Sequence, residues 1–319
     1  MKELLRTNDP VLLSFAEAVL REAGFHPMVA DTHMSILDGS IAAIPRRLLV
    51  PAEVEAEARV ALDQALAAPV PPPPDETTED RFLGGRLVLR QPAHGFRAGL
   101  DSVMLAAAVP AGAGDLVLEF GSGAGAAALC LAARVSELDL VGLEPQEDLV
   151  ALATWNAQAN GLGEAAVFFA GSVEAPPPDL PRDHFDHVLM NPPFFVAGRD
   201  DASPDAARRT AAIADGGALA RWTKAARTHL HAKGTLTAVL PADRLAAMLA
   251  ALETGFGGLV VFPLWPRAGE AAKRILVQAR KGSRAPLVLA PGLVLHAAEG
   301  GYTAAADDIL RGGAGLRLG

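Results

Sequence analysis

Four consecutive prolines within PVPPPPDETTED, residues 69–80, interrupt this chain of 319 residues. Proline fixes φ and lacks a backbone N–H, so the run excludes a helix and favours extended polyproline II. The acidic residues that follow should stay solvated and keep the segment extended. We therefore predict a semi-rigid linker over 69–80 between two folded units, residues 1–68 and residues 81–319, and the chain is long enough for two domains.

Composition narrows the class of protein. The single cysteine, Cys130, excludes a disulfide framework and a thiolate metal cluster. The charged start MKELLRTND does not resemble a secretion signal, and every apolar run is broken well short of the roughly 20 residues that span a bilayer. We therefore expect a soluble, cytoplasmic protein. The net charge of -9 argues against a general nucleic-acid coat, which needs a basic surface.

Basic residues nevertheless cluster in one part of the sequence. The cluster surrounds one acid, Glu270, and consists of Arg267, Lys273, Arg274, Arg280, Lys281 and Arg284. Two interpretations stay open. The cluster is either a phosphate-binding patch on an otherwise acidic protein, or a strand edge with ordinary solvated charges.

The pattern of the first unit predicts a small β-α-β-β-α sandwich. A helix should begin at Asn8 or Asp9 and end at Gly24. We expect strands at 3–6, 27–30 and 47–50 and a second helix at 52–66. The segments RTNDPVLLSFAEAVLREAG and AIPRRLLVP resemble a family of small prokaryotic domains grouped with signal-transducing proteins. That resemblance brings no catalytic motif, so a binding or regulatory role and a purely structural role both stay open, and the unit's partner is not assigned.

The second unit alternates strands with helices, which is typical of a mostly parallel sheet covered by helices on both faces. The expected parallel strands are 116–120, 138–143, 166–170, 187–190 and 234–240. Two later strands, 258–262 and 275–280, are joined by a loop without a helix, which predicts an antiparallel hairpin at the sheet edge. A further hairpin, from 287–289 and 292–296, should precede a short helix at 304–311.

A glycine-rich turn, VLEFGSGAG, follows the first of these strands. Glu119 ends the strand, and Gly121, Gly123 and Gly125 stand at alternate positions before an apolar helix. Glycines let the backbone turn tightly and approach a bound adenosine closely. Glu144 ends the next strand, where a Rossmann-like fold needs a carboxylate for the ribose hydroxyls. The G-x-G-x-G spacing, with an acid two residues earlier, resembles motif I of S-adenosyl-L-methionine-dependent methyltransferases rather than a dinucleotide-binding loop.

The same resemblance implies further contacts with S-adenosyl-L-methionine. Glu119 would touch the ligand, although a buried, hydrogen-bonded strand-end acid is the alternative. Ser172 stands where this class often carries an aspartate for the adenine amino group, and its hydroxyl is a weaker acceptor than a charged carboxylate. In GFRAGLDSVMLAAA, Arg97 and Asp101 would line the methionine end of the cofactor. Asp101 is also predicted to cap the helix that starts there.

The segment VLMNPPFF directly follows the fourth parallel strand, and ligands of open α/β sheets bind at the carboxyl ends of strands. The Asn191 side-chain oxygen and the Pro192 carbonyl can each accept one N–H of a planar, sp2-bonded nitrogen, which polarises that nitrogen for attack on a methyl group. Pro193 helps to fix the turn, and Phe194 can stack on a base. Asn191 would also border the cofactor. An isolated N-P-P also marks ordinary turns, but its place after the glycine-rich turn favours the catalytic interpretation.

Taken together, GFRAGLDSVMLAAA, LEFGSGAG, FDHVLMNPPFF and the tail KRILVQARKGSRAPLVLAPGLVLH make the second unit similar to the tRNA adenine-N6 methyltransferase family, which modifies position 37 of valine tRNA. The resemblance implies a class I, Rossmann-like methyltransferase sheet of α/β type, S-adenosyl-L-methionine as cofactor, and tRNA as partner. No metal is implied, because no His, Cys or acid cluster has metal-ligand spacing. The expected RNA contacts are Arg199, Arg208, Arg209, Lys273, Arg274, Lys281 and Arg284.

Three alternatives remain. Motifs of the NPP-aromatic type also serve guanine-N2 methylation of rRNA and glutamine N5-methylation of release factors. A protein that binds S-adenosyl-L-methionine for regulation, without catalysis, is the third alternative, because Ser172 departs from the usual pattern.

Overall fold

The computed structural model describes residues 1–7, 13, 16–17, 19–21, 23–30, 46–67, 76–95, 97–178, 180–192 and 217–319. The chain divides into two compact units, Met1–Val70 and Pro71–Gly319. Residues 69–75 of the predicted linker lie outside the described residues. Its last part is not a linker, because Thr77–Asp80 belong to strand β4 (Thr77–Phe82). The side chains of β4 are largely exposed, so an acidic composition is compatible with a strand there.

The first unit contains an antiparallel sheet with the strand order β1-β3-β2. Its elements are β1 (Lys2–Thr7), β2 (Met28–Ala30), β3 (Arg46–Val50), a 3-10 turn (Ala52–Val54) and α3 (Glu55–Ala67). The expected strands are confirmed to within one residue at each end, whereas the predicted helix start at Asn8 or Asp9 lies outside the described residues. The buried core consists of Leu4, Leu13, Ala16, Leu20, Leu48, Val50, Ala58 and Leu62.

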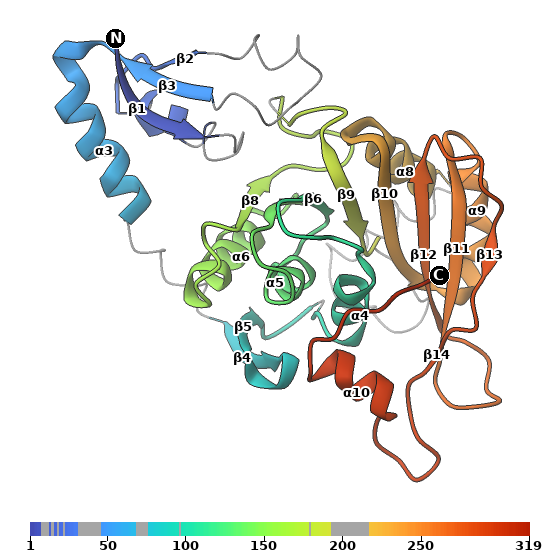
Figure 1. Cartoon of the computed structure of the whole chain (residues 1–319). Helices are drawn as coiled ribbons and strands as arrows, with labels where there is room; N and C mark the ends of the chain where they lie inside the picture. The colour runs from blue at the N-terminus through green and yellow to red at the C-terminus, as the bar shows by residue number, and fades with distance from the viewer. Residues whose placement is uncertain are drawn as a thin grey trace. The chain divides into compact units, whose positions relative to one another are not determined.

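The second unit is built on a sheet whose central strands are parallel, as predicted (Figure 1). In spatial order these strands are β10 (Leu230–Pro241), β9 (Phe185–Met190), β6 (Leu116–Phe120), β7 (Asp139–Glu144) and β8 (Ala166–Ala170). Strands buried on both faces read as nearly continuous apolar runs, which describes β6 well.

Helices cover both faces of this sheet (Figure 1). On one face lie α4 (Leu100–Ala108), α5 (Ala126–Ala132) and α6 (Glu147–Ala159), and on the other lie α8 (Ala218–His229) and α9 (Leu245–Leu252). Short 3-10 turns occur at Leu83–Gly85 and Ala242–Arg244. Within the described residues, no helix is long and apolar enough to cross a membrane.

The antiparallel end of the sheet confirms one predicted hairpin and corrects another. β11 (Phe256–Trp265) pairs antiparallel with β12 (Arg274–Lys281), which also pairs antiparallel with β10. β13 (Val288–Leu289) and β14 (Leu293–Val294) do not form the predicted hairpin with each other. Each of them instead pairs parallel with β11. The chain reverses nowhere between them and follows β11 along its length, so β11 is not an edge strand. α10 (Ala304–Leu310) comes next, with Thr303 as its N-cap.

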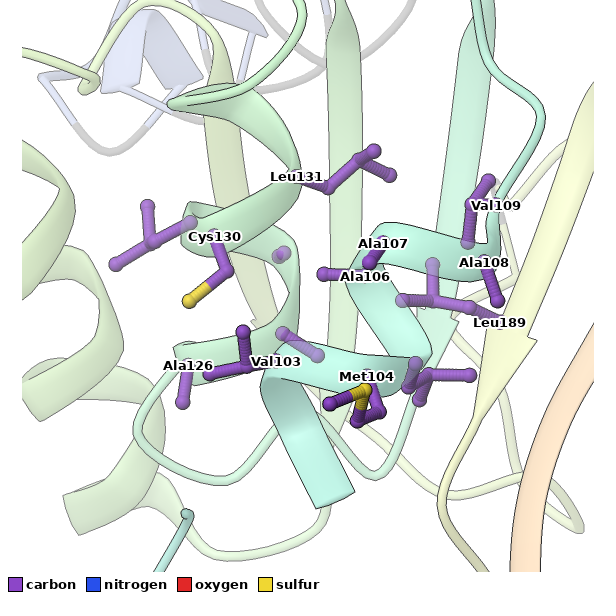
Figure 2. Close-up of a cluster of buried hydrophobic side chains, with 14 of the residues drawn as sticks. Val103, Met104, Ala106, Ala107, Ala108, Val109, Ala126, Cys130, Leu131 and Leu189 are labelled. Carbon is purple, nitrogen blue, oxygen red and sulfur yellow. The ribbon is translucent and has the colours of Figure 1, made fainter. Parts of the chain in front are cut away.

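The core between α4 and α5 is rich in alanine (Figure 2). Val103 and Met104 of α4 and Cys130 and Leu131 of α5 are buried in one cluster with Leu189 of β9. Small side chains let the two helices approach closely. Burial raises the pKa of the Cys130 thiol to about 12, so it stays protonated and serves as a packing residue. Because α5 starts directly after Gly125, this packing also fixes the glycine-rich turn.

A two-stranded ribbon of β4 and β5 (Leu87–Pro92) was not predicted; it is held by Asn156 of α6 and by Asn160, the C-cap of that helix. The Asn156 side chain accepts the N–H of Arg90 at 2.7 Å and donates to its carbonyl at 2.9 Å. Asn160 makes the same pair of bonds with Val88, at 2.9 and 2.8 Å. Residues four apart lie on the same face of a helix, and residues two apart lie on the same side of a strand. The two amides therefore meet the backbone N–H and carbonyl groups of Val88 and Arg90, as a neighbouring strand would.

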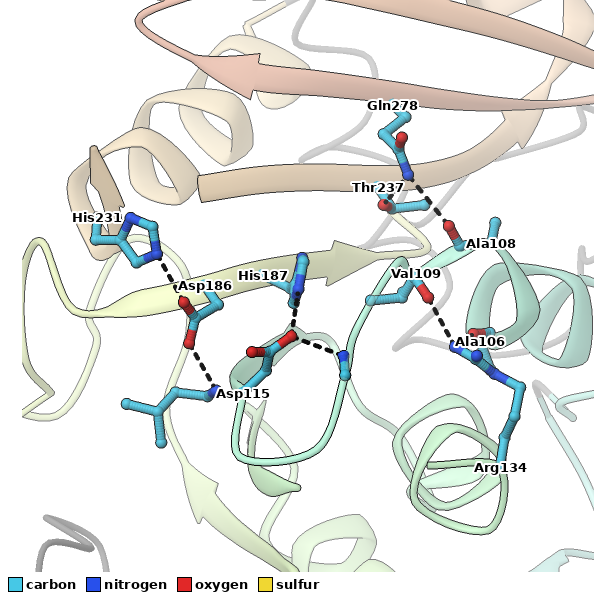
Figure 3. A network of polar contacts seen from close by, with 12 residues as sticks. Ala106, Ala108, Val109, Asp115, Arg134, Asp186, His187, His231, Thr237 and Gln278 are labelled. Carbon is cyan, nitrogen blue, oxygen red and sulfur yellow. Dashed lines mark hydrogen bonds and ion pairs between the residues drawn. The ribbon is translucent and has the colours of Figure 1, made fainter. Parts of the chain in front are cut away.

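Polar side chains tie together the amino-terminal ends of β6, β9 and β10 (Figure 3). His187 Nε2 lies 3.1 Å from Asp115 Oδ2, and Asp186 accepts the N–H of Leu116 at 2.9 Å. The other Asp186 oxygen lies 2.7 Å from His231 Nε2. Burial lowers the pKa of His187, so this ring stays neutral at neutral pH. These contacts keep the strands in register at the edge opposite the candidate site.

Candidate active site

The glycine-rich turn is shaped by three backbone conformations that other residues rarely adopt. Gly121, Gly123 and Gly125 have φ values of 67°, 54° and 82°. A Cβ on Gly121 would lie 3.0 Å from the Trp222 ring, and one on Gly125 would lie 2.9 Å from Phe168. A Cβ on Gly123 would meet no atom within 4 Å. Two of the glycines therefore allow close packing, whereas the third borders open space that a ligand can use.

Glu144 holds the turn from the carboxyl end of β7. Its carboxylate accepts the N–H of Gly123 at 3.0 Å and the N–H of Gln146 at 3.1 Å. The Gln146 side chain adds a bond at 3.3 Å. A carboxylate has about four acceptor positions, so one is left for a ligand hydroxyl. The predicted neighbourhood of Glu144 and the glycines is present, and its contact with the ribose stays a prediction.

Glu119 lies beneath the turn with only 3% of its surface exposed. It accepts the N–H of Ala128 in α5 at 3.0 Å. Burial raises the pKa of Glu119 to about 8; the Ala128 N–H opposes that rise, and the charge of Glu144 adds to it. At neutral pH the group is therefore mostly protonated. Glu119 therefore has the geometry of a buried acid that is hydrogen-bonded within the protein, which was the alternative interpretation of the sequence. Its contact with a ligand stays a prediction.

Asp101 does not cap α4, so that prediction is wrong. Gly99 is the N-cap, and its carbonyl already accepts the N–H groups of Ser102 and Val103. Asp101 lies in the first turn, where the helix dipole favours an acid, and it accepts Arg274 Nε at 2.8 Å. The side chain thereby links α4 to β12.

Arg97 is turned toward the β4–β5 ribbon. Its guanidinium contacts Asp80 and Thr78, and it donates to the Pro92 carbonyl at 2.9 Å. Ser172 follows β8, and its hydroxyl accepts the N–H of Ala175 at 3.0 Å, which leaves one lone pair and one proton for a ligand. The proposed cofactor contacts of Arg97, Asp101 and Ser172 stay predictions.

Asn191 and Pro192 follow β9 at the same edge of the sheet as the glycine-rich turn. Met190 is in register with Phe120 on one side and with Ala238 on the other, so Asn191 stands in the row directly beyond the end of β6. Asn191 is half-buried and Pro192 is buried. The remaining predicted residues of this segment lie outside the described residues: Pro193, Phe194, Arg199, Arg208 and Arg209.

The basic residues do not form one patch, because β12 separates them. Arg274 pairs in register with Pro241, so it lies at the carboxyl edge together with Lys273. Lys281 ends β12 at the opposite edge, where it contacts Asp183 at 2.5 Å and the Leu230 carbonyl at 2.6 Å. Only the first group can reach a ligand that also touches Asn191. In the part of the chain that the structure describes, no three potential metal ligands gather.

Sequence reasoning missed the role of Asn156, and it predicted Trp222 as a packing residue without identifying what Trp222 packs against. Asn156 is fully buried, and besides holding Arg90 it donates to the Ala124 carbonyl of the glycine-rich turn at 2.9 Å. Trp222 of α8 packs against Gly121 and edge-on against Phe120, with 6.2 Å between the ring centroids. The spacing of Asn156 and Asn160, four residues apart, could have indicated the role of Asn156, because buried side-chain amides need hydrogen-bond partners. Nothing in the sequence pairs Trp222 with a glycine that precedes it by about a hundred residues.

Comparison with known families agrees with both predicted resemblances. The family described as "Methyltransferase small domain" matches residues 97–262. The family described as "Putative prokaryotic signal transducing protein" matches residues 1–65.

Individual proteins are also similar to this chain. A tRNA1(Val) (adenine(37)-N6)-methyltransferase of Actinobacillus succinogenes is 28% identical over 191 residues, which are 58% of this chain and 77% of that protein. The protein of the same name from Aeromonas hydrophila is 28% identical over 212 residues, 65% of this chain and 85% of its own. Among solved structures, a predicted O-methyltransferase from Agrobacterium tumefaciens has a TM-score of 0.58 at 26% identity and covers 68% of this chain and 98% of itself.

Proposed function

Because this chain belongs to the methyltransferase small domain family, we propose that it methylates N6 of an adenine in tRNA, at position 37 of valine tRNA. Its cofactor is S-adenosyl-L-methionine, and methyl transfer is its chemistry. The observation that carries the finer proposal is that Asn191 and Pro192, which open the sequence NPPF, directly follow β9 at the same sheet edge as the glycine-rich turn. The two relatives that share the proposed activity in name match this chain over most of their own length.

Residues of the carboxyl edge suit the cofactor. Glu144 offers its remaining acceptor position to a ribose hydroxyl, and the open space beside Gly123 admits an adenosine close to the backbone. Ser172 offers its remaining lone pair to an amino group. When bound, S-adenosyl-L-methionine supplies an electrophilic methyl group on a sulfonium. Asp101, which is paired with Arg274, lies in the first turn of α4 and would border the methionine end.

The acceptor nitrogen needs activation, because the lone pair of an exocyclic amine is delocalised into the base. The Asn191 oxygen and the Pro192 carbonyl each accept one N–H, which returns electron density to the nitrogen. With the cofactor bound, the polarised nitrogen would take its methyl group, the thioether sulfur would leave with the electrons of the carbon–sulfur bond, and the proton of the nitrogen would pass to water. Rate enhancement comes from positioning and from fixed acceptors rather than from a strong base. The base must be unpaired or flipped out to reach this edge.

A labelling experiment tests the proposal. Full-length protein, S-adenosyl-L-methionine labelled in its methyl group and an unmodified transcript of valine tRNA are incubated, and the nucleosides are then identified. We expect labelled N6-methyladenosine, and no label in a matched transcript with guanine at position 37. Total rRNA and a translation release factor are the competing substrates. Labelled N2-methylguanosine or N5-methylglutamine would replace the proposal with one of those activities, and no transfer to any of them would favour a cofactor-binding regulator.

A further inference from the structure

An aromatic pair stands at the carboxyl edge of the sheet, away from the residues assigned so far. His296 and Tyr302 lie between β14 and α10, with their rings stacked at 5.0 Å between centroids and 19° between planes. β14 pairs with Leu264 and Trp265 at the end of β11, and Leu264 is in register with Arg274. The loop therefore extends beyond the same edge as Asn191, as Figure 1 shows for the chain between β14 and α10.

The loop that carries the two rings is held by several backbone bonds. His296 donates its N–H to the Pro266 carbonyl at 3.0 Å, and Thr303 bonds the Leu295 and Val294 carbonyls at 2.9 and 2.7 Å. His296 Nδ1 also lies 3.2 Å from the Gly301 carbonyl. These bonds hold the backbone on both sides of Tyr302 before any ligand arrives, and the stacked His296 ring supports the Tyr302 ring. A fixed platform loses little conformational freedom when it binds.

Tyr302 is exposed in a way that packing does not explain. It keeps 36% of its surface exposed, and it is the one aromatic residue among the large apolar side chains that stay exposed in the described residues. One face of its ring is covered by His296. A flat ring with a covered back and an exposed side is suited to stacking on another planar group.

Cations lie at the same sheet edge as this loop, on a protein that is otherwise acidic. Arg274 begins β12 there, directly after Lys273, and Arg267 follows the end of β11. Arg274 is engaged by Asp101 and Arg267 by Glu270, whereas the exposed Lys273 side chain makes no ion pair with any described residue. Positive charge beside an exposed ring is the combination with which proteins bind single-stranded nucleic acid.

We propose that Tyr302, supported by His296, stacks on an unpaired base of the RNA substrate, with Lys273 contacting a neighbouring phosphate. This inference rests on the proposed function. Four strand spacings separate β9 from β14, about 19 Å in all, so the stacked base lies some nucleotides away from the methylated one. The ring would thereby select RNA whose target lies within an unpaired loop of several nucleotides.

Substitutions of the full-length protein test this site through RNA binding and KM. We expect Tyr302→Ala to weaken binding of the valine tRNA transcript and raise its KM by about tenfold. The kcat at saturating RNA and the affinity for S-adenosyl-L-methionine should stay unchanged. Tyr302→Phe keeps the ring and should behave as the wild type. Leu289→Ala, which removes a more exposed side chain from β13, is the matched control and should change nothing.

Direct binding and methyl transfer together separate the possible failures. If the wild type methylates the RNA and Tyr302→Ala binds and reacts equally well, the stacking site is wrong and the proposed function stands. If the wild type neither binds nor methylates RNA, both fall. Should Tyr302→Ala unfold, Tyr302→Leu preserves apolar bulk without the ring, and wild-type affinity in that folded variant would overturn the inference.

Discussion

Glu119 and Glu144 end neighbouring parallel strands, yet their surroundings give them different chemistry. Glu119 lies beneath the glycine-rich turn and bonds a helix N–H, whereas Glu144 bonds N–H groups of the turn itself. Burial raises the pKa of Glu119 to about 8, so it is held as a neutral acid at neutral pH. The sequence predicted the position of both acids correctly. It could not separate their roles, because burial depends on the helix packed over each strand end.

The raised pKa of Glu119 predicts a pH-dependent stability. Between its usual value of 4.5 and about 8, the folded protein keeps a proton that the unfolded chain releases. The free energy of unfolding should therefore fall as pH rises, by up to about 1.4 kcal/mol per pH unit from this group. Glu119→Gln should remove that slope, so its stability relative to wild type should increase from pH 5 to pH 8 in urea titrations. Glu164→Gln, an exposed change, is the control, and parallel curves for wild type and Glu119→Gln would contradict the account.

Gly123 offers a test of the open space beside the turn. Gly123→Ala should cost about 1–2 kcal/mol of stability, because φ is positive there, and it should abolish most binding of S-adenosyl-L-methionine. Gly161→Ala is a matched control, since Gly161 also has a positive φ and open space around a Cβ, but it lies at the end of α6. Calorimetric titration of both variants measures the difference. Equal cofactor affinity in the two would show that the space beside Gly123 is not the binding site.

At the scale of elements, the parallel strands could be predicted from the sequence, whereas the pairing of β13 and β14 and the β4–β5 ribbon could not. Strong apolar runs identify β6, β7, β8 and β9 because buried strands need them. The course of β13 and β14 was mispredicted, since a turn sequence alone does not reveal that the chain can continue along β11. The β4–β5 ribbon was missed because β4 is polar and largely exposed, and because β5 is held on its other side by a pair of asparagine amides.

The amide contacts predict a large effect from one substitution. Asn156→Ala would leave the Arg90 N–H and the Arg90 and Ala124 carbonyls without partners in the interior. We expect a loss of about 2–4 kcal/mol in the free energy of unfolding. Gln158→Ala, on the exposed side of the same helix, should stay within about 0.5 kcal/mol. Denaturant titration compares the two, and equal stabilities would mean that the ribbon is held by other contacts.

At the scale of the whole second unit, the two edges of one sheet carry different groups of residues. At the amino edge, His187 and Asp115 contact each other. The carboxyl edge gathers the glycine-rich turn, Glu144, Asn191 and Lys273. The sequence predicted that the glycine-rich turn, Glu144 and Asn191 follow the carboxyl ends of parallel strands, and made no prediction for the amino edge. It could not show that Lys281 lies at the amino edge, away from Lys273. The two residues are close in sequence, but β12 runs from one edge of the sheet to the other between them.

Asn191→Ala tests the central claim most directly, in a single-turnover measurement with saturating S-adenosyl-L-methionine and the valine tRNA transcript. The account predicts that the rate of methyl transfer falls by about 100-fold or more, because one of two fixed acceptors is lost, while the dissociation constant of S-adenosyl-L-methionine stays close to that of the wild type. A variant that transfers methyl groups at the wild-type rate, or that loses only cofactor binding, would contradict the role of Asn191 in activating the nitrogen.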